Sequence, residues 1–296
     1  MRVPALRISP PFMHHLMVRF MVRASLASLI TAAFLVGAPL YARAASTVWL
    51  ARAAPVRIMA LGDSITAGVG EHGIDTGSGG YRAELVRLLE ARGYRATMVG
   101  GRSDYSARIT SRHHEGWPGY VIRSFPSDPA PQLYGRVMRE ALTAARPDVV
   151  LLMAGTNDLL RKARHSPGYT VPNIVESMDA LLAQIFYLEP QVDVVVAGVV
   201  DSPRILQCDV ASFDGTNECG PSDGPSLKTL VAAYGARGFH IELADGMGNA
   251  VPRDKYHFPD GIHPTGVGGY DDVARVWMQA LENVTSADAH NTVAGR

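Results

Sequence analysis

The stretch DVVLLMAG, residues 148–155, is apolar at nearly every position after its first. A second run of the same kind, VDVVVAGVV, follows at residues 192–200. Strands that are buried on both faces, as in a parallel sheet, have this composition, whereas strands with one face in water alternate apolar and polar residues. The two runs therefore predict a parallel sheet that is covered by helices on both sides.

Other short apolar runs and several stretches with helical spacing lie around these two. The further apolar runs are residues 56–61, 96–100 and 239–243. The helical stretches are residues 81–93, 133–147, 173–190 and 266–284. Strands that alternate with helices predict an α/β fold, a three-layer α/β/α domain with a five-stranded parallel sheet and right-handed crossovers.

The first 44 residues have the pattern of a secretory signal peptide. Arg19 and Arg23 precede the apolar stretch ASLASLITAAFLVGAPLY, and an Ala-x-Ala sequence ends at residue 44. The apolar part is shorter than the ~20 residues that a membrane span needs. We therefore expect a chain that starts at Met1 or Met17, is cleaved, is not stably inserted in a membrane, and is secreted or periplasmic.

The remaining chain, residues 45–296, is expected to be a single domain with its core at about 56–283 and a frayed tail. It has 23 basic against 28 acidic side chains, a net charge of about −5. This balance argues against nucleic acid as a partner. Its two cysteines, Cys208 and Cys219, lie in a loop-like segment. In an oxidising compartment such a pair predicts a disulfide.

Polar or glycine-rich segments follow the predicted strands. In a parallel sheet, functional residues lie at this carboxyl edge. The segments are GDS (62–64) after the first run, HHEGWPGY (113–120) beyond the second, GTND (155–158) at the end of the third, and FPDGIHPTG (258–266) after the fifth.

These segments contain the groups that nucleophilic catalysis needs. A serine hydroxyl requires a base to take its proton and donors to stabilise the oxyanion. Ser64 supplies the hydroxyl, His263 can be the base, and Asp260 can orient the imidazole. Asn157 and Gly119, with the N–H of Ser64, are candidate oxyanion donors. Three of the segments also have a structural interpretation: a turn at 62–64, a helix cap at Asn157 and a plain loop at 260–264.

In order and placement, GDSITAG, HEGWPGY, GTND and DGIHP resemble the four signature blocks of the SGNH, or GDSL, hydrolases. The resemblance covers roughly residues 56–282. It implies a flavodoxin-like sheet and ester hydrolysis through an acyl-enzyme, without a cofactor or a metal. The implied roles are nucleophile for Ser64, the rest of the triad for Asp260 and His263, and the oxyanion hole for Ser64, Gly119 and Asn157, with Gly116 as the other glycine of the second block.

Within this family, GGYRAELVRLL, HEGWPGYVI and VVLLMAGTNDL are similar to the acetylxylan-esterase-like branch. Trp117 and the insert around the two cysteines depart from its pattern. We expect a serine esterase that removes short acyl groups, such as acetyl, from small-molecule or polysaccharide esters. A lipase, arylesterase or thioesterase of the same fold is one alternative, and a non-catalytic carbohydrate-binding protein is another.

Three other motifs lack the context that their functions need. GPSDG, residues 220–224, matches the G-x-S-x-G elbow, but no strand leads directly into Ser222. GVGEHG, residues 68–73, matches a dinucleotide fingerprint, but the predicted strand has already ended at Leu61. HHE, residues 113–115, contains adjacent histidines that would point to different sides, so we expect no metal there.

Overall fold

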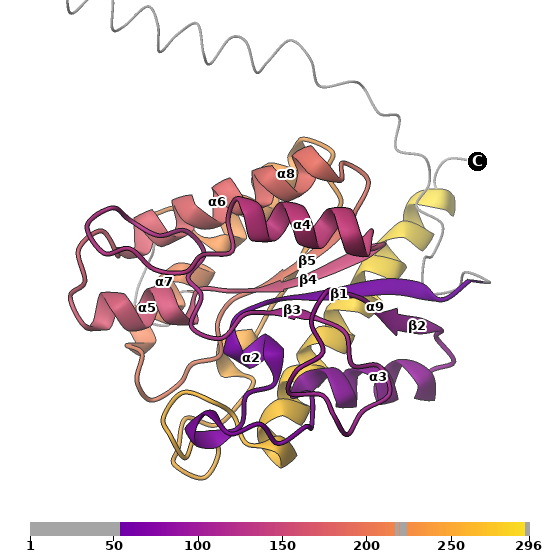
Figure 1. The fold of residues 1–296 in the computed structure, drawn as a ribbon. Helices are drawn as coiled ribbons and strands as arrows, with labels where there is room; N and C mark the ends of the chain where they lie inside the picture. The colour runs from indigo at the N-terminus through magenta and orange to yellow at the C-terminus, as the bar shows by residue number, and fades with distance from the viewer. Residues whose placement is uncertain (1–53, 217–218, 220–223, 294–296) are drawn as a thin grey trace, which may run out of the picture. The chain divides into compact units, whose positions relative to one another are not determined.

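The computed structural model describes residues 54–216, 219 and 224–293, which are built around a parallel sheet (Figure 1). Its strands are β1 (Val56–Gly62), β2 (Ala96–Met98), β3 (Glu115–Gly116), β4 (Val149–Met153), β5 (Asp193–Ala197) and β6 (Ile241–Ala244). Hydrogen bonding orders them β2-β1-β4-β5-β6, with every pair parallel. The five predicted runs form this path, and the predicted flavodoxin-like sheet is confirmed.

The short strand β3 was not predicted. It pairs with the last two residues of β1, whereas β2 pairs with the first three. The two short strands therefore lie one after the other along the same edge of β1. This pairing brings the segment that begins at Glu115 beside the end of β1, immediately before Ser64.

Successive residues of the central strands face opposite sides of the sheet. In β4, Val150 and Leu152 belong to one hydrophobic cluster, while Val149, Leu151 and Met153 belong to the other. Side chains of α4, α5, α6, α7 and α8 complete the first cluster, and those of α3 and α9 complete the second. Because both faces are covered, both alternating sets of side chains must be apolar, which explains the composition of residues 148–155.

The helices are α2 (Ser64–Ala67), α3 (Tyr81–Ala91), α4 (Arg136–Ala145), α5 (Thr156–Ala163), α6 (Val171–Leu188), α7 (Gln207–Asp214), α8 (Leu227–Ala236) and α9 (Asp271–Val293), with short turns at η2 (Glu71–Gly73), η3 (Met247–Asn249) and η4 (Gly266–Tyr270). The predicted helical stretches correspond to α3, α4, α6 and α9. The last of these, α9, runs to Val293, beyond the predicted end of the core at about residue 283.

Among the described residues, no helix has the length and apolar character to span a membrane. The predicted signal peptide lies outside these residues.

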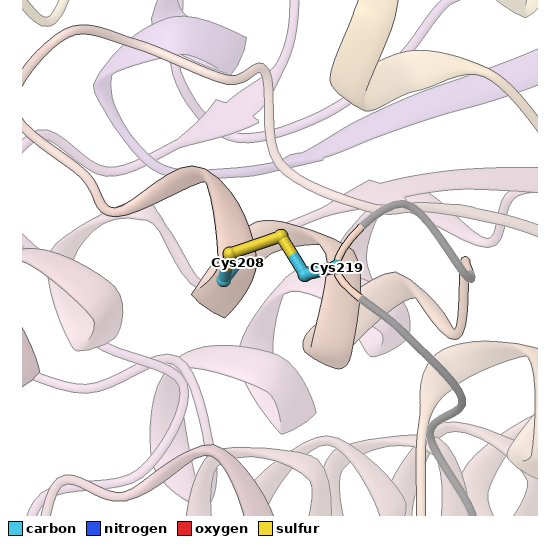
Figure 2. Close-up of a disulfide and its surroundings, with 2 residues drawn as sticks. All are labelled: Cys208 and Cys219. Carbon is cyan, nitrogen blue, oxygen red and sulfur yellow. A yellow bond between two sulfur atoms is a disulfide. The ribbon is translucent and has the colours of Figure 1, made fainter.

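A disulfide joins α7 to the segment that follows it (Figure 2). It links Cys208, in the first turn of α7, to Cys219, with the two Cα atoms 5.4 Å apart, as the sequence predicts. On α7, Asp209 also forms an ion pair with Lys162 of α5 at 2.7 Å. The bridge therefore closes a loop whose helix is held against α5.

Candidate active site

Ser64 lies just beyond the end of β1, as the first residue of the four-residue helix α2. The preceding Asp63 caps this helix, because its Oδ1 accepts from the N–H of Ile65 at 3.0 Å. Asp63 is fully buried, and this burial raises the pKa of its carboxyl. At Gly62, a Cβ would lie 1.9 Å from the main-chain oxygen of Met153 in β4. Close packing against β4 therefore requires Gly62, and the cap of the helix that begins with Ser64 requires Asp63.

Asp260 is held in an array of hydrogen bonds. Its Oδ1 accepts from the main-chain N–H groups of Ile262 and His263, both at 2.8 Å. Its Oδ2 accepts from the main-chain N–H of His72 at 2.9 Å and from Nδ1 of His263 at 2.7 Å. Burial alone would raise the pKa of this carboxyl, but the hydrogen bonds from His263 and from the main chain outweigh it and lower the pKa to about 2. The carboxylate is therefore ionised at neutral pH.

His263 connects this carboxylate to Ser64. Its Nε2 lies 2.9 Å from Oγ of Ser64. Because the ionised Asp260 can only accept, Nδ1 of His263 carries the proton and Nε2 is left to accept from the serine hydroxyl. The structure thus brings together Ser64, His263 and Asp260, the three residues that the sequence predicts as a triad, in the order required for proton transfer.

Two main-chain N–H groups near the Ser64 hydroxyl were predicted as oxyanion donors, those of Ser64 and Gly119. Ser64 is the first residue of α2, so its N–H has no acceptor within the helix. Gly119 has φ +80°, and nothing lies within 4 Å of the position that a Cβ would take. Within the part of the chain that the structure describes, the N–H of Gly119 has no hydrogen-bond acceptor.

The other glycine of this block is already engaged. The N–H of Gly116 donates to Nδ1 of His114 at 3.0 Å. In addition, a Cβ at Gly116 would lie 2.3 Å from the main-chain nitrogen of Ala67 in α2. Gly116 therefore serves close packing between β3 and the helix that begins with Ser64, which favours Gly119 as the donor.

Asn157 does not cap α5. The N-cap of that helix is Gly155, and no side chain caps it. Instead, Nδ2 of Asn157 donates to the main-chain oxygen of Tyr120 at 2.9 Å. The structural alternative considered for Asn157, a helix cap, is therefore wrong, and its amide joins α5 to the residue that follows Gly119.

Asp158 holds the same two segments together. It is fully buried, and both of its carboxylate oxygens accept from the main-chain N–H of Ile122, at 3.1 and 3.3 Å. Burial raises the pKa of this carboxyl to about 7. The GTND sequence thus supplies two adjacent side chains that fix residues 120–122.

Trp117 is anchored beside this segment. Its indole N–H donates to Oε2 of Glu115 at 3.1 Å, and its ring lies 5.1 Å from that of Tyr120. The guanidinium of Arg102 stacks over the indole at 4.4 Å. The sequence singled out Trp117 only as a departure from the family pattern, and it did not reveal these contacts.

Two of the remaining motifs, residues 68–73 and 113–115, lie within the described part of the chain. Ser222 lies outside the described residues. His114 is buried and uses both ring nitrogens, since Nε2 donates to the main-chain oxygen of Asp104 at 2.9 Å and Nδ1 accepts from Gly116. Burial, followed by the charge of Arg82, lowers the pKa of His114 to about 4. In residues 68–73, Gly68 ends α2 and does not connect a strand to a helix.

A parallel α/β sheet whose first strand leads into such a serine is the architecture of a carboxylic ester hydrolase of the SGNH type. The chain belongs to the GDSL-like lipase/acylhydrolase family, whose model matches residues 60–269. The fold and the family that the resemblance implied are therefore confirmed.

Individual relatives agree with this assignment. A multidomain esterase from Ruminococcus flavefaciens is 26% identical over 279 residues, which are 88% of this chain and 32% of that protein. This chain thus spans about a third of the relative's length. Two solved structures share the fold. A family 3 carbohydrate esterase from Clostridium thermocellum has TM-score 0.60 and 24% identity, covering 79% of this chain and 98% of the other. One from Talaromyces cellulolyticus has TM-score 0.59 and 19% identity, covering 78% and 99%.

Proposed function

We propose that the protein hydrolyses short-chain acyl esters of carbohydrates, acetyl esters above all, through a Ser64–His263–Asp260 triad and an acyl-enzyme. The observation that carries this proposal is the continuous hydrogen-bonded chain from the ionised Asp260 through His263 to the Ser64 hydroxyl, with contacts of 2.7 and 2.9 Å. The three side chains are therefore already arranged for His263 to take the proton of the Ser64 hydroxyl.

In the first half of the reaction, Nε2 of His263 takes the hydroxyl proton while Oγ of Ser64 bonds to the ester carbonyl carbon. The carbonyl oxygen becomes an oxyanion, which accepts from the N–H groups of Ser64 and Gly119 and from the amide of Asn157. The tetrahedral intermediate then breaks its bond to the alcohol oxygen, which leaves with the proton from His263. The acyl group stays on Ser64.

In the second half, water replaces the alcohol. Nε2 of His263 takes a proton from the water as its oxygen bonds to the acyl carbon, and the same donors stabilise the second oxyanion. The bond to Oγ of Ser64 then breaks, and the proton on His263 returns to that oxygen. The products are a carboxylic acid and the free enzyme.

The substrate part of the proposal is supported by the relatives. Two structures with the same fold are described as family 3 carbohydrate esterases, and the curated relative is described as an esterase. The sequence blocks around residues 79–89 and 114–122 are also similar to the acetylxylan-esterase-like branch.

An ester panel tests both parts of the proposal. Wild-type protein, Ser64→Ala and the control Ser177→Ala are assayed on acetylated xylan, acetylated glucose, p-nitrophenyl acetate and a long-chain p-nitrophenyl ester. Ser177 is a suitable control because its buried hydroxyl donates within α6, to the main-chain oxygen of Asn173 at 2.8 Å. We expect acetate release from the acetylated sugars by the wild type and Ser177→Ala, and none by Ser64→Ala.

Three results would contradict the proposal. Activity retained in Ser64→Ala would exclude the triad. A higher kcat/KM on the long-chain ester than on the acetylated sugars would make the protein a lipase, and binding of xylan without any hydrolysis would make it a carbohydrate-binding protein.

We also propose that the protein acts after export, to the periplasm or the medium. The N-terminal sequence pattern and the Cys208–Cys219 disulfide support this proposal, because such bonds persist in oxidising compartments. Amino-terminal sequencing of exported protein is expected to start near Ala45. An N-terminus that retains the apolar stretch would contradict it.

A further inference from the structure

Arg82, the second residue of α3, is a buried cation outside the proposed triad. Its side chain has 0% exposure, and burial lowers the pKa of its guanidinium to about 10, which leaves it charged at neutral pH. No carboxylate in residues 54–216, 219 or 224–293 forms an ion pair with it, and its N–H groups donate to main-chain oxygens and one hydroxyl. A buried charge that forms no ion pair is costly to keep, so the groups that it binds indicate its role.

One side of the guanidinium binds α2. Nε donates to the main-chain oxygen of Thr66 at 3.0 Å, and Nη2 donates to that of Ala67 at 2.9 Å. These are the last two residues of the helix, whose carbonyl groups have no acceptor role inside it. Because α2 is only one turn long and begins with Ser64, Arg82 fixes the far end of the helix whose first N–H is a proposed oxyanion donor.

The other side of the guanidinium binds the segment that precedes β3. Nη2 also donates to Oγ of Ser106 at 2.7 Å, and Nη1 donates to the main-chain oxygen of Arg112 at 3.0 Å. The Ser106 hydroxyl in turn donates to the main-chain oxygen of Asp104 at 3.0 Å. The guanidinium therefore joins two segments that lie about forty residues apart in the chain.

The network continues from Asp104 toward Gly119. The Asp104 oxygen also accepts from Nε2 of His114 at 2.9 Å, and Nδ1 of His114 accepts from the N–H of Gly116. The next N–H, that of Trp117, donates to the main-chain oxygen of Gly62 at 2.9 Å. The hydrogen bonds that start at Arg82 thus reach the residues immediately before Gly119, and they return to β1 two residues before Ser64.

We propose that Arg82 is a positioning residue for ester hydrolysis. Its guanidinium fixes α2 and residues 104–117 relative to each other, so that the N–H groups of Ser64 and Gly119 meet at one oxyanion position. This inference rests on the proposed function. It predicts that Arg82 contributes to kcat without touching the substrate, because two donors that are misplaced by about an ångström lose much of their effect on the transition state.

The test compares Arg82→Lys, Arg82→Ala and Ser106→Ala with the wild type on p-nitrophenyl acetate. Reactive serines are counted with diethyl p-nitrophenyl phosphate, which releases one p-nitrophenolate for each serine that it phosphorylates, so that kcat is expressed per reactive site. We expect kcat per site to fall roughly tenfold to a hundredfold in both Arg82 variants, with KM changed only a few-fold. Ser106→Ala, which removes one of the four hydrogen bonds, is expected to give a smaller fall of the same kind.

Guanidinium ion, at concentrations far below those that unfold proteins, is expected to restore part of kcat to Arg82→Ala. The matched control is Arg57→Ala. Arg57 also donates to main-chain oxygens, those of Ala145 at 2.5 Å and Arg146 at 3.1 Å, but at the opposite end of β1. Its variant is expected to keep a normal kcat per site and to gain nothing from guanidinium.

Unchanged kcat per reactive site in Arg82→Lys and Ser106→Ala would overturn the inference, even if Arg82→Ala fails to fold. It would make Arg82 a purely structural residue. Failure of the proposed function gives a different result, since Ser64→Ala would then keep its activity whatever Arg82 does.

Discussion

The side-chain amide of Asn157 donates to the main-chain oxygen of Tyr120 at 2.9 Å, so the start of α5 is tied to the segment that contains Gly119. This bond uses one amide hydrogen and fixes the plane of the amide, while the second hydrogen stays available. A donor that is oriented before the substrate arrives needs no reorganisation during the reaction. The contact therefore gives Asn157 a structural role beside the proposed chemical one, and experiments can separate the two.

For Asn157→Ala, kcat is expected to fall by ~10²–10³, about 3–4 kcal/mol in transition-state stabilisation, while KM moves only a few-fold. The control is Asn173→Ala, because Nδ2 of Asn173 also donates to a main-chain oxygen, that of Gly168 at 2.8 Å, at the start of α6. Both variants lose one such bond, so their Tm values should fall alike. An Asn157→Ala protein that is less stable but has full kcat would leave Asn157 with a structural role only.

Replacement of Asp260 tests the orientation of the histidine. Asp260→Asn keeps the shape of the side chain but favours the wrong tautomer of His263, and we expect kcat to fall by roughly 10³–10⁴. The chain contains its own control, because Asp254 and His257 repeat the same spacing, with a contact of 2.9 Å between the carboxylate and Nδ1. Asp254→Asn is expected to leave kcat unchanged. Equal losses in the two variants would contradict the specific role of Asp260.

The acid limit of stability should also depend on Asp260. The pKa of this carboxyl is lowered to about 2 in the folded protein, so its hydrogen bonds stabilise the fold above the ordinary carboxyl pKa of about 4. This contribution is lost as the pH falls from about 4 to about 2. Urea unfolding at several pH values should show the difference between wild type and Asp260→Asn shrinking over that interval, and a constant difference would refute it.

Asp158 should have the opposite effect on stability. Burial raises the pKa of its carboxyl to about 7, so the protonated form stabilises the fold at low pH. This contribution is complete below about pH 4 and declines as the pH rises toward about 7. The Tm of the wild type relative to Asp158→Asn is therefore expected to fall across this range. Asp128→Asn, which changes a carboxylate paired with Arg161 whose pKa is lowered, should not reproduce that decline.

Loss of the disulfide should lower stability by on the order of 2–3 kcal/mol, since the bridge joins cysteines at a sequence separation of 11. The double variant Cys208→Ser/Cys219→Ser is compared with wild type in urea unfolding, with and without a thiol reductant. Reductant should destabilise the wild type to the level of the double variant and leave that variant unchanged. Thiol labelling of the oxidised wild type is expected to find no reactive cysteine, and labelling of both would contradict the bridge.

The parts of the fold that can be predicted are those that leave a pattern in the amino-acid sequence. The strands are predictable because both faces of the sheet are covered, which leaves runs of apolar residues such as 148–155. Strand β3 could not be predicted, because a strand of two residues is too short to show a periodic pattern. Arg82 occupies the buried face of α3 together with Leu85 and Leu89, at a helical position where the residue type predicts exposure. The burial of Arg82 is explained only by the main-chain oxygens from other segments that accept its hydrogen bonds.

The site shows the same division. Side-chain chemistry and the resemblance to the family predicted that Ser64, His263 and Asp260 lie together, and the structure brings them together. The main-chain N–H of His72, which donates to Asp260, carries no signature in the sequence, because every residue except proline has such a group. The hydrogen bond from Asn157 to Tyr120 could not be predicted either, since it depends on how α5 packs against a loop from another part of the chain.

The pairing of β1 with β4 has a consequence for how the chain folds. Ile58 lies opposite Val149, so the pairing of β1 with β4 spans about ninety residues, and Ser64 meets His263 across 199 residues. Closing such long loops is slow relative to forming helices, whose contacts are local. After dilution from denaturant, the helical circular-dichroism signal should therefore recover before hydrolysis does. The rate at which hydrolytic activity returns would then measure the last step of folding, in which the segment containing His263 packs at the end of β1.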